Sequence, residues 1–383
     1  MNKHRNNLSL FQLIDRKNFN LLAEKWKIDK GVRSFKTWEL TGALIECLTL
    51  RLENFRSVEQ TLGIAKSTLS DALSERCSGF FQDLCDEILR GIRGRTKDRK
   101  LKRAIRQILA IDSTEVDVHG SLFNKPGWGK KYSKSHQASL KLHTICNVDG
   151  NWVEDFLITG SRKHDSPAAF KLRLMSRKTY VFDRAYNDLK FWLDIMECGS
   201  HFVTRLKDCP RTKKLRNKIL SRNHECDGVL HDGFYEPSPA IVSRNRKRLE
   251  NVQIRHIIYR DPETRKVFDF VTSDLKAPAE EIAAIYKRRW AVELLFRWFK
   301  GHLGVRRLAI KNTNAAEVLL AVAVLLQLLL QLKKIDSKFD GTLWQLLQKI
   351  RSSLNRRTFS SNEAPDDCRW KSATVDPLNK IAS

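Results

Sequence analysis

The chain lacks the cysteine patterns of a secreted or zinc-stabilised protein. Its eight cysteines include no Cys-x-x-Cys pair and no regular spacing, which argues against a disulfide framework. The nearest approach to a metal pattern is His224-x-Cys226, and one such pair is too little to hold zinc. We therefore expect reduced, mostly buried thiols, as in a protein of the cytosol.

The sequence also lacks a segment that reads as a membrane span or a signal peptide. Its N-terminus is charged and has no apolar core region. The most apolar run, residues 315–332, is interrupted by Glu317, Gln327 and Gln331, which favours a buried helix over a span. We expect a cytoplasmic protein without a membrane partner.

Acidic residues are scarce relative to basic ones. Lys and Arg number 70 against 44 Asp and Glu, so the formal net charge is +26. The excess is spread along the chain and is not confined to a tail. This charge favours a polyanionic partner, which can be DNA, RNA or an anionic membrane surface.

Residues 1–98 predict an all-helical domain, because apolar residues recur at helical spacing in several segments. Within it, residues 55–73 predict two short helices joined by a tight turn at Gly63, which tolerates positive φ. Ser67 and Thr68 would open the second helix, which in a helix-turn-helix enters the major groove by its N-terminal residues. Helix-Gly-helix units are also common in plain bundles, so this DNA contact is a hypothesis.

Two further basic stretches suit contact with a phosphate backbone. Residues 90–106 carry nine cations and one acid, and they fit either a solvated linker or a phosphate-binding connector. Residues 124–137 place Trp128 among lysines that include Lys130 and Lys131. That composition is typical of loops that hold nucleic acid, although many such loops have no function.

A strand pattern follows and places two aspartates after apolar strands. Residues 107–112 read as a strand that ends in Asp112, and residues 179–186 contain a second that ends in Asp183. A hairpin and helices lie between them, and this order predicts a mixed α/β sheet flanked by helices, with a site at strand ends. Residues 208–275 are basic and β-branched, which predicts a β-rich insertion.

Residues 282–303 contain no proline and read as one helix. At 100° per residue, one face of it carries a polar stripe made of Tyr286, Arg289, Glu293, Arg297 and Lys300. A solvated face with i,i+4 ion pairs explains this stripe. A metal-binding Glu293 among cations that hold a phosphate backbone also explains it. Trp290, beside the stripe, would stack on a displaced base or serve a structural role.

Asp112, Asp183 and Glu293 would meet if the two strand ends and the helix lie together. A carboxylate after a buried strand is costly unless it is exposed or paired, and three that meet repel one another at neutral pH. A divalent metal removes that repulsion, and hard oxygen ligands favour Mg²⁺ or Mn²⁺ over zinc. Two such ions about 4 Å apart can support an in-line phosphoryl displacement.

The helix matches, position for position, the Y-(2)-R-(3)-E-(6)-K signature of the IS4 family of DDE insertion-sequence transposases, here Tyr286, Arg289, Glu293 and Lys300. The sequence DST at 112–114 and the sequence FDRAY at 182–186 resemble that family's blocks around its two aspartates. The resemblance covers roughly residues 105–310.

The resemblance implies an RNase H-like catalytic core over residues 99–310, with the β-rich insertion inside it. The helical DNA-binding domain of residues 1–98 would precede this core, and a helical C-terminal region of residues 311–383 would follow it. The implied catalytic and metal-binding residues are Asp112, Asp183 and Glu293. The implied phosphate contacts are Tyr286, Arg289 and Lys300, and helix geometry adds Arg297.

The same resemblance implies cut-and-paste transposition on double-stranded DNA. In that scheme two Mg²⁺ ions serve hydrolysis at the transposon end, and the freed 3′-OH closes a hairpin that is reopened before strand transfer. Two other interpretations stay open: a sequence-specific DNA-binding regulator with structural acids, and a metal-dependent nuclease on the same fold without strand transfer. Pairing of two ends implies a homodimer on DNA, for which helices within 311–354 are a hypothetical contact.

Overall fold

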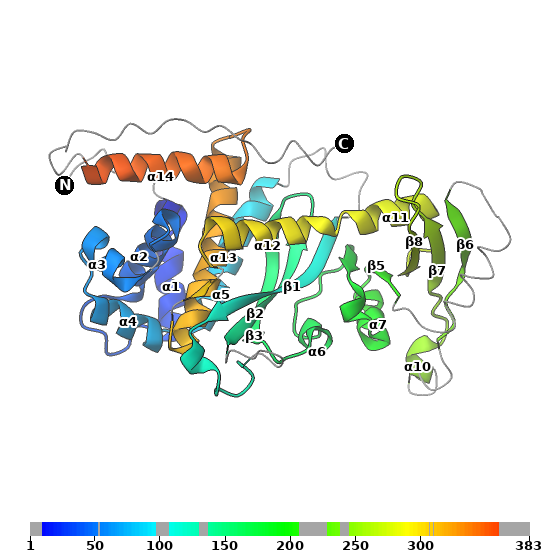
Figure 1. Cartoon of the computed structure of the whole chain (residues 1–383), viewed down its shortest axis with the longest axis horizontal. Helices are drawn as coiled ribbons and strands as arrows, with labels where there is room; N and C mark the ends of the chain where they lie inside the picture. The colour runs from blue at the N-terminus through cyan, green and yellow to red at the C-terminus, as the bar shows by residue number, and fades with distance from the viewer. Residues whose placement is uncertain are drawn as a thin grey trace.

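The computed structural model describes residues 10–52, 54–96, 107–129, 137–206, 228–237, 245–305, 307–308 and 310–359. A helical region lies beside a twisted mixed sheet, and the last strands of the sheet lie farthest from those helices (Figure 1). The fold is therefore mixed α/β, as the sequence predicts.

The described part of the N-terminal segment is helical, and its elements are η2 (Leu10–Leu13), α1 (Arg16–Trp26), α2 (Thr37–Leu50), α3 (Phe55–Leu62), α4 (Lys66–Glu75) and α5 (Ser78–Thr96). The linker interpretation of residues 90–106 is wrong for residues 90–96. They continue α5, because Ile92 is fully buried on its apolar face.

The predicted pair of short helices is present as α3 and α4. The side chain of Asn54 accepts the Ser57 amide and caps α3, and Gly63 ends the helix with φ of 68°. Ser67 and Thr68 lie in the first turn of α4, the former exposed and the latter half-buried.

Helix α13 (Thr313–Asp336) is the central element of the helical region, where it packs against α5, α4 and α2. It is the helix of the described residues that is long and apolar enough to cross a membrane, but 89% of its apolar window is buried inside the protein. The prediction of a buried helix is thus confirmed. Gln327 and Gln331 donate to the carbonyl of Asn151, which satisfies polar groups inside this apolar wall.

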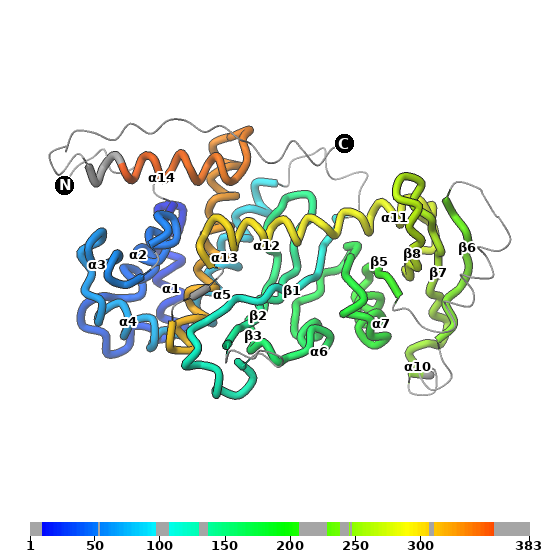
Figure 2. The backbone as a smooth tube through the Cα atoms, viewed as in Figure 1, coloured from blue at the N-terminus to red at the C-terminus, as the bar shows by residue number. Residues whose placement is uncertain are grey.

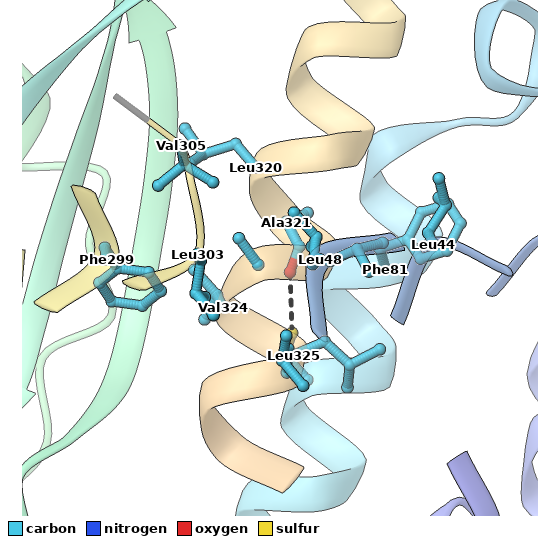
Figure 3. Close-up of a cluster of buried hydrophobic side chains, with 14 of the residues drawn as sticks. Leu44, Leu48, Phe81, Phe299, Leu303, Val305, Leu320, Ala321, Val324 and Leu325 are labelled. Atoms are coloured by element: carbon cyan, nitrogen blue, oxygen red, sulfur yellow. Dashed lines mark hydrogen bonds between the residues drawn. The ribbon is translucent and has the colours of Figure 1, made fainter. Parts of the chain in front are cut away.

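The core around α13 joins the helices to the sheet. Leu320, Val324 and Leu325 of α13 meet Leu48 of α2 and Leu303 near the sheet (Figure 3). Helix α14 (Leu343–Phe359) follows and packs on α13 and α2. Because α13 is enclosed in this way, α14 is the more exposed of the two helices within 311–354, and the hypothesis that these helices contact a second copy stays a prediction.

The sheet has the order β3-β2-β1-β4-β5-β8-β7-β6, with the short β9 also pairing with β1. Its strands are β1 (Ile108–Val118), β2 (Ala138–Asn147), β3 (Trp152–Gly160), β4 (Thr179–Phe182), β5 (His201–Arg205), β6 (Val229–Phe234), β7 (Arg255–Arg260), β8 (Val267–Thr272) and β9 (Arg307–Leu308). Strands β3, β2 and β1 are antiparallel, and β1, β4 and β5 are parallel.

The strands expected as an insertion extend the same sheet. Strand β8 pairs antiparallel with β5, and β7 and β6 follow it outward. These strands thus prolong the sheet beyond its parallel part.

Helices cover both faces of the sheet. The described helices that occur between its strands are η3 (Gly120–Leu122), α6 (Asp165–Ala169), η4 (Arg184–Tyr186), α7 (Leu189–Glu197), α10 (Arg246–Leu249), α11 (Ala279–Lys287) and α12 (Trp290–His302). Phe191 and Trp192 of α7 pack on Phe182 and Phe202 at one face. On the other face α12 packs on β1, and α11 packs on the strands from β4 to β8. Figure 1 shows α12 and α11 in succession along the sheet.

Candidate active site

Asp112 and Asp183 occupy equivalent places on neighbouring parallel strands. The last paired residues of β1 and β4 are Ile111 and Phe182, and the next residue on each strand is an aspartate. Strand β1 itself continues beyond Asp112 against β2, so the prediction that Asp112 ends its strand is wrong. The carboxylate is nonetheless partly exposed, at a point where β1 has lost its β4 neighbour.

The stretch predicted as one helix is two helices, α11 and α12, with a turn at Arg288 and Arg289. The Arg289 amide bonds to the carbonyl of Tyr286 at 3.0 Å, and the Val292 amide bonds to that of Arg289 at 3.1 Å. This three-residue spacing is typical of a 3₁₀ turn. Both turn residues keep right-handed backbone angles, so the helices follow one another in nearly one direction (Figure 2).

The guanidinium of Arg289 lies between two of the three predicted acids. Its Nη1 donates to Asp112 Oδ2 at 3.1 Å, and its Nη2 donates to Glu293 Oε1 at 2.6 Å. The hydroxyl of Tyr286 donates to Asp183 Oδ1 at 3.4 Å, a long hydrogen bond. The last turn of helix α11 and the 3₁₀ turn that follows it thus contact both aspartates.

The electrostatics of these groups are coupled. Burial is the largest influence on Asp112 and, with the negative charges of Glu293 and Asp183, it raises the pKa of this carboxyl to about 6. The Ser113 amide and the Arg289 cation oppose that rise. Burial disfavours the charged form of Arg289, yet the pKa of the guanidinium rises overall because acidic groups surround it.

A divalent metal fits the donors at this site, although the side chains are not arranged around a common point. Three carboxylates are hard oxygen ligands, and each of the other two raises the pKa of Asp112, as expected of acids that share one region. In the described part of the chain, no three His, Cys, Asp or Glu side chains are close enough together to hold an ion. Arg289 holds the position between Asp112 and Glu293.

Trp290, beside the predicted stripe, is the first residue of α12 and is 50% exposed. The other two residues of the stripe lie farther along α12, where Arg297 is exposed. Lys300 lines a groove next to α3 and α4. Lys130 and Lys131 lie outside the described residues.

A second polar group, missed in the sequence, lies on the opposite face of β1. Ser113 donates to Asp165 Oδ1 at 2.8 Å, and the Lys141 ammonium lies 3.2 Å from the same oxygen. His143 lies 3.6 Å from it, and burial lowers the pKa of His143 to about 4, which keeps the ring neutral at pH 7. Asp165 is far from Ser113 in sequence, so the sequence could not show that they meet. The alternation of side chains along the strand could only have indicated that Ser113 faces away from Asp112.

The fold and the site place this chain among proteins in which a mixed sheet and a flanking helix bring acidic side chains together beside cations. Its family follows from sequence comparison. The "Transposase DDE domain" family profile matches residues 103–329, and the chain belongs to this family of DDE transposases. Proteins with this domain use divalent metal ions. The predicted membership is therefore confirmed.

Two relatives cover most of this chain. A Sinorhizobium fredii protein, y4zB, is named as a transposase, is 30% identical over 322 residues, and aligns across 82% of this chain and 84% of its own. A Geobacillus stearothermophilus protein is named as the transposase of insertion sequence element IS5377. It is 27% identical over 389 residues, which is 100% of this chain and 97% of the relative.

A solved structure shares the fold. It is a piggyBac transposase synaptic complex with hairpin DNA, and the likeness has a TM-score of 0.50 at 12% identity. The match covers 95% of this chain and 84% of that chain. At this identity the likeness concerns the fold alone.

Proposed function

We propose that the protein is the DNA transposase of an insertion sequence, which hydrolyses phosphodiesters at the element's ends and transfers the freed strands into target DNA. One observation carries this proposal: a single guanidinium, that of Arg289, contacts both Asp112 of the sheet and Glu293 of α12. Acids that are 181 residues apart in the chain, 293 minus 112, thereby share one counter-charge.

Asp112, Asp183 and Glu293 are the residues that would hold Mg²⁺, or Mn²⁺ in its place. Such ions would activate the attacking water or 3′-OH and stabilise the leaving oxygen. For this the Arg289 side chain moves away from Asp112 and Glu293 and pairs with a phosphate of the DNA, as a bidentate guanidinium does well. In the absence of DNA the same side chain compensates the repulsion among the acids.

The other cations of α12 bind and orient the DNA. Arg297 and Lys300 lie one and two turns beyond Glu293 and hold phosphates beside the cleavage point. Trp290 offers an exposed ring on which an unpaired base can stack. Stacking of that kind supports a hairpin intermediate at the cut end, which is part of the proposal.

The proposed division of the chain follows from this scheme. An RNase H-like catalytic core spans 99–310, with a β-rich insertion at about 208–275, and helices of 1–98 bind the terminal repeats through Ser67 and Thr68. A C-terminal region of 311–383 completes the chain. The partners are the transposon ends, target DNA and a second copy of the chain in the synaptic complex, in the cytoplasm.

A nicking and joining assay tests the proposal. The substrate is a plasmid that carries the inverted repeats flanking the gene, with Mg²⁺ or EDTA in the buffer. Wild-type protein should nick at the repeat ends only with metal and join the ends to a second DNA. The substitutions Asp112→Asn, Asp183→Asn and Glu293→Gln should abolish both products while binding of the repeat persists.

Asp188→Asn provides the matched control. Asp188 caps α7 by accepting the Lys190 amide, and Asn caps helices equally well, so this variant should remain active. Binding by the wild type without metal-dependent cleavage would contradict the proposal and favour a regulator. Cleavage without joining would favour a nuclease.

A further inference from the structure

A groove of about 1370 Å³ separates the short helices α3 and α4 from the end of the catalytic helix α12. Helix α2 forms one wall, and Lys300, Gly301 and Gly304 form the other. The groove thus connects the helix pair that resembles a helix-turn-helix with the helix that carries Glu293.

The walls of this groove are basic. They include one acid, Asp117, and five cations, which are Arg51, Arg56, Lys66, Lys300 and Lys311. Four of these cations form no ion pair with a carboxylate of the described ranges, and they are Arg51, Arg56, Lys66 and Lys311. Five cations beside one acid indicate an anionic ligand.

A second observation is the positive potential where α2 and α12 end. Burial lowers the pKa of His302 and of Arg351, and repulsion from Arg51 lowers both pKa values further. Arg351 has a structural task here, because it donates to the carbonyls of Thr49 and His302 at these helix ends. Arg51 lies against Gly304, with its Cγ 3.4 Å from where a Cβ would stand.

The floor of the groove is part of the packed core. Leu48, Leu69 and Leu303 line it and are also members of the buried core, in which Leu48 and Leu303 face α13 (Figure 3). Arg56, Lys66 and Lys300 are mounted on helices around this core, which hold their spacing. Arg51 directly follows α2, and Lys311 lies two residues before α13. Such a surface suits a long ligand of regular charge better than a small anion.

We propose that this groove holds the sugar-phosphate backbone of duplex DNA between the repeat-binding helices and the cleavage point. The inference rests on the proposed function and adds Arg51, Arg56, Lys66 and Lys311 to the DNA-binding residues. Lys300 lies seven residues beyond Glu293, about 10 Å along the helix. One strand of B-DNA carries a phosphate every 3.4 Å along its axis, so about three phosphates span that distance.

The test compares two triple variants with equal charge loss. The groove variant is Arg56→Gln, Lys66→Gln and Lys311→Gln, and the control variant is Lys190→Gln, Arg265→Gln and Lys266→Gln, which changes exposed cations away from the groove. Arg51 is left intact because it packs on Gly304. Thermal melts verify that both variants fold.

The probe is a fluorescein-labelled duplex whose binding is measured against NaCl concentration. Each lost phosphate contact lowers the slope of log Kd on log salt by about 0.9, so the groove variant should lose about 2.7 from the slope and bind at least about tenfold more weakly at 150 mM. The control variant should keep the wild-type slope.

A folded groove variant with the wild-type slope would overturn the inference, and so would an equal loss in both variants. These results leave the proposed function intact if the wild type still nicks and the acid variants do not. A different outcome is a wild type that does not nick while the groove variant shows the reduced slope. That outcome would contradict the proposed function and still support a groove that holds DNA.

Discussion

Replacing Arg289 by Gln removes the guanidinium that contacts both Asp112 and Glu293. The change leaves Asp112 and Glu293, whose side chains are 21% and 30% exposed, without their shared cation. Breaking a fully buried pair costs about 3–5 kcal/mol, and an exposed pair contributes about 0–1 kcal/mol. These half-buried carboxylates fall between the two cases, so we expect a loss of about 1–3 kcal/mol.

The same substitution should strengthen the response to metal. With the guanidinium gone, it no longer competes with a metal cation for the two carboxylates, and the negative charges of Glu293 and Asp183 still act on Asp112. Ligand at 100 times its Kd stabilises a protein by about 2.7 kcal/mol. We therefore expect Mg²⁺ to raise the Tm of Arg289→Gln by more than it raises that of the wild type.

Thermal unfolding at pH 7.5 without DNA, with EDTA or with Mg²⁺, measures both effects. In EDTA the variant should melt about 2–6 °C below the wild type. Arg297→Gln is the control on the same helix, and it should melt like the wild type because Arg297 is exposed. If Arg289→Gln melts like the wild type in EDTA, or if Mg²⁺ shifts both proteins equally, the account of Arg289 as counter-charge is refuted.

Three further predictions concern the scaffold. Burial lowers the pKa of His256 to about 4, so the folded state binds fewer protons than the unfolded state. The free energy of unfolding should therefore fall as the pH drops from 6.5 to 4. The His256→Phe variant should lose about 2 kcal/mol less of it than the wild type does, as measured by urea denaturation at pH 7 and 4.5. Leu325→Ala opens a cavity in the core beside α13 and should cost about 2–5 kcal/mol in chemical denaturation. Arg351→Ala removes donors from the Thr49 and His302 carbonyls and should cost about 1–3 kcal/mol. It should also speed hydrogen exchange in α14, and unchanged exchange would contradict the bridging role of Arg351.

The local periodicity of the sequence was enough to predict the strands that lead to Asp112 and Asp183, the hairpin between them and the buried helix α13. It also placed Tyr286, Arg289 and Glu293 on one face, because a helical stripe depends on residues close in the chain. The 3₁₀ turn at Arg289 escaped prediction because no proline or glycine marks it. The turn reflects tertiary contacts of its side chain with the sheet.

Features that depend on distant pairing could not be read from the sequence. Strand β8 joins β5 across more than sixty residues, so the predicted insertion gave no sign of extending the sheet. The basic groove requires α2 and α12 to lie together, and Arg51 and Lys300 are 249 positions apart, 300 minus 51. Helix α13 looked like part of a separate terminal region, yet it forms the core that joins Leu48 to Leu303.

Counting bound metal tests the central claim most directly. Electron paramagnetic resonance of Mn²⁺ titrated into the protein, with and without a repeat-end duplex, gives the number and affinity of bound ions. We predict that wild type on DNA binds two ions and that Glu293→Gln, like Asp112→Asn, binds fewer or binds them at least about tenfold more weakly. Equal numbers and affinities in wild type and Glu293→Gln would show that the acid of α12 does not share a metal with the sheet, which contradicts the account.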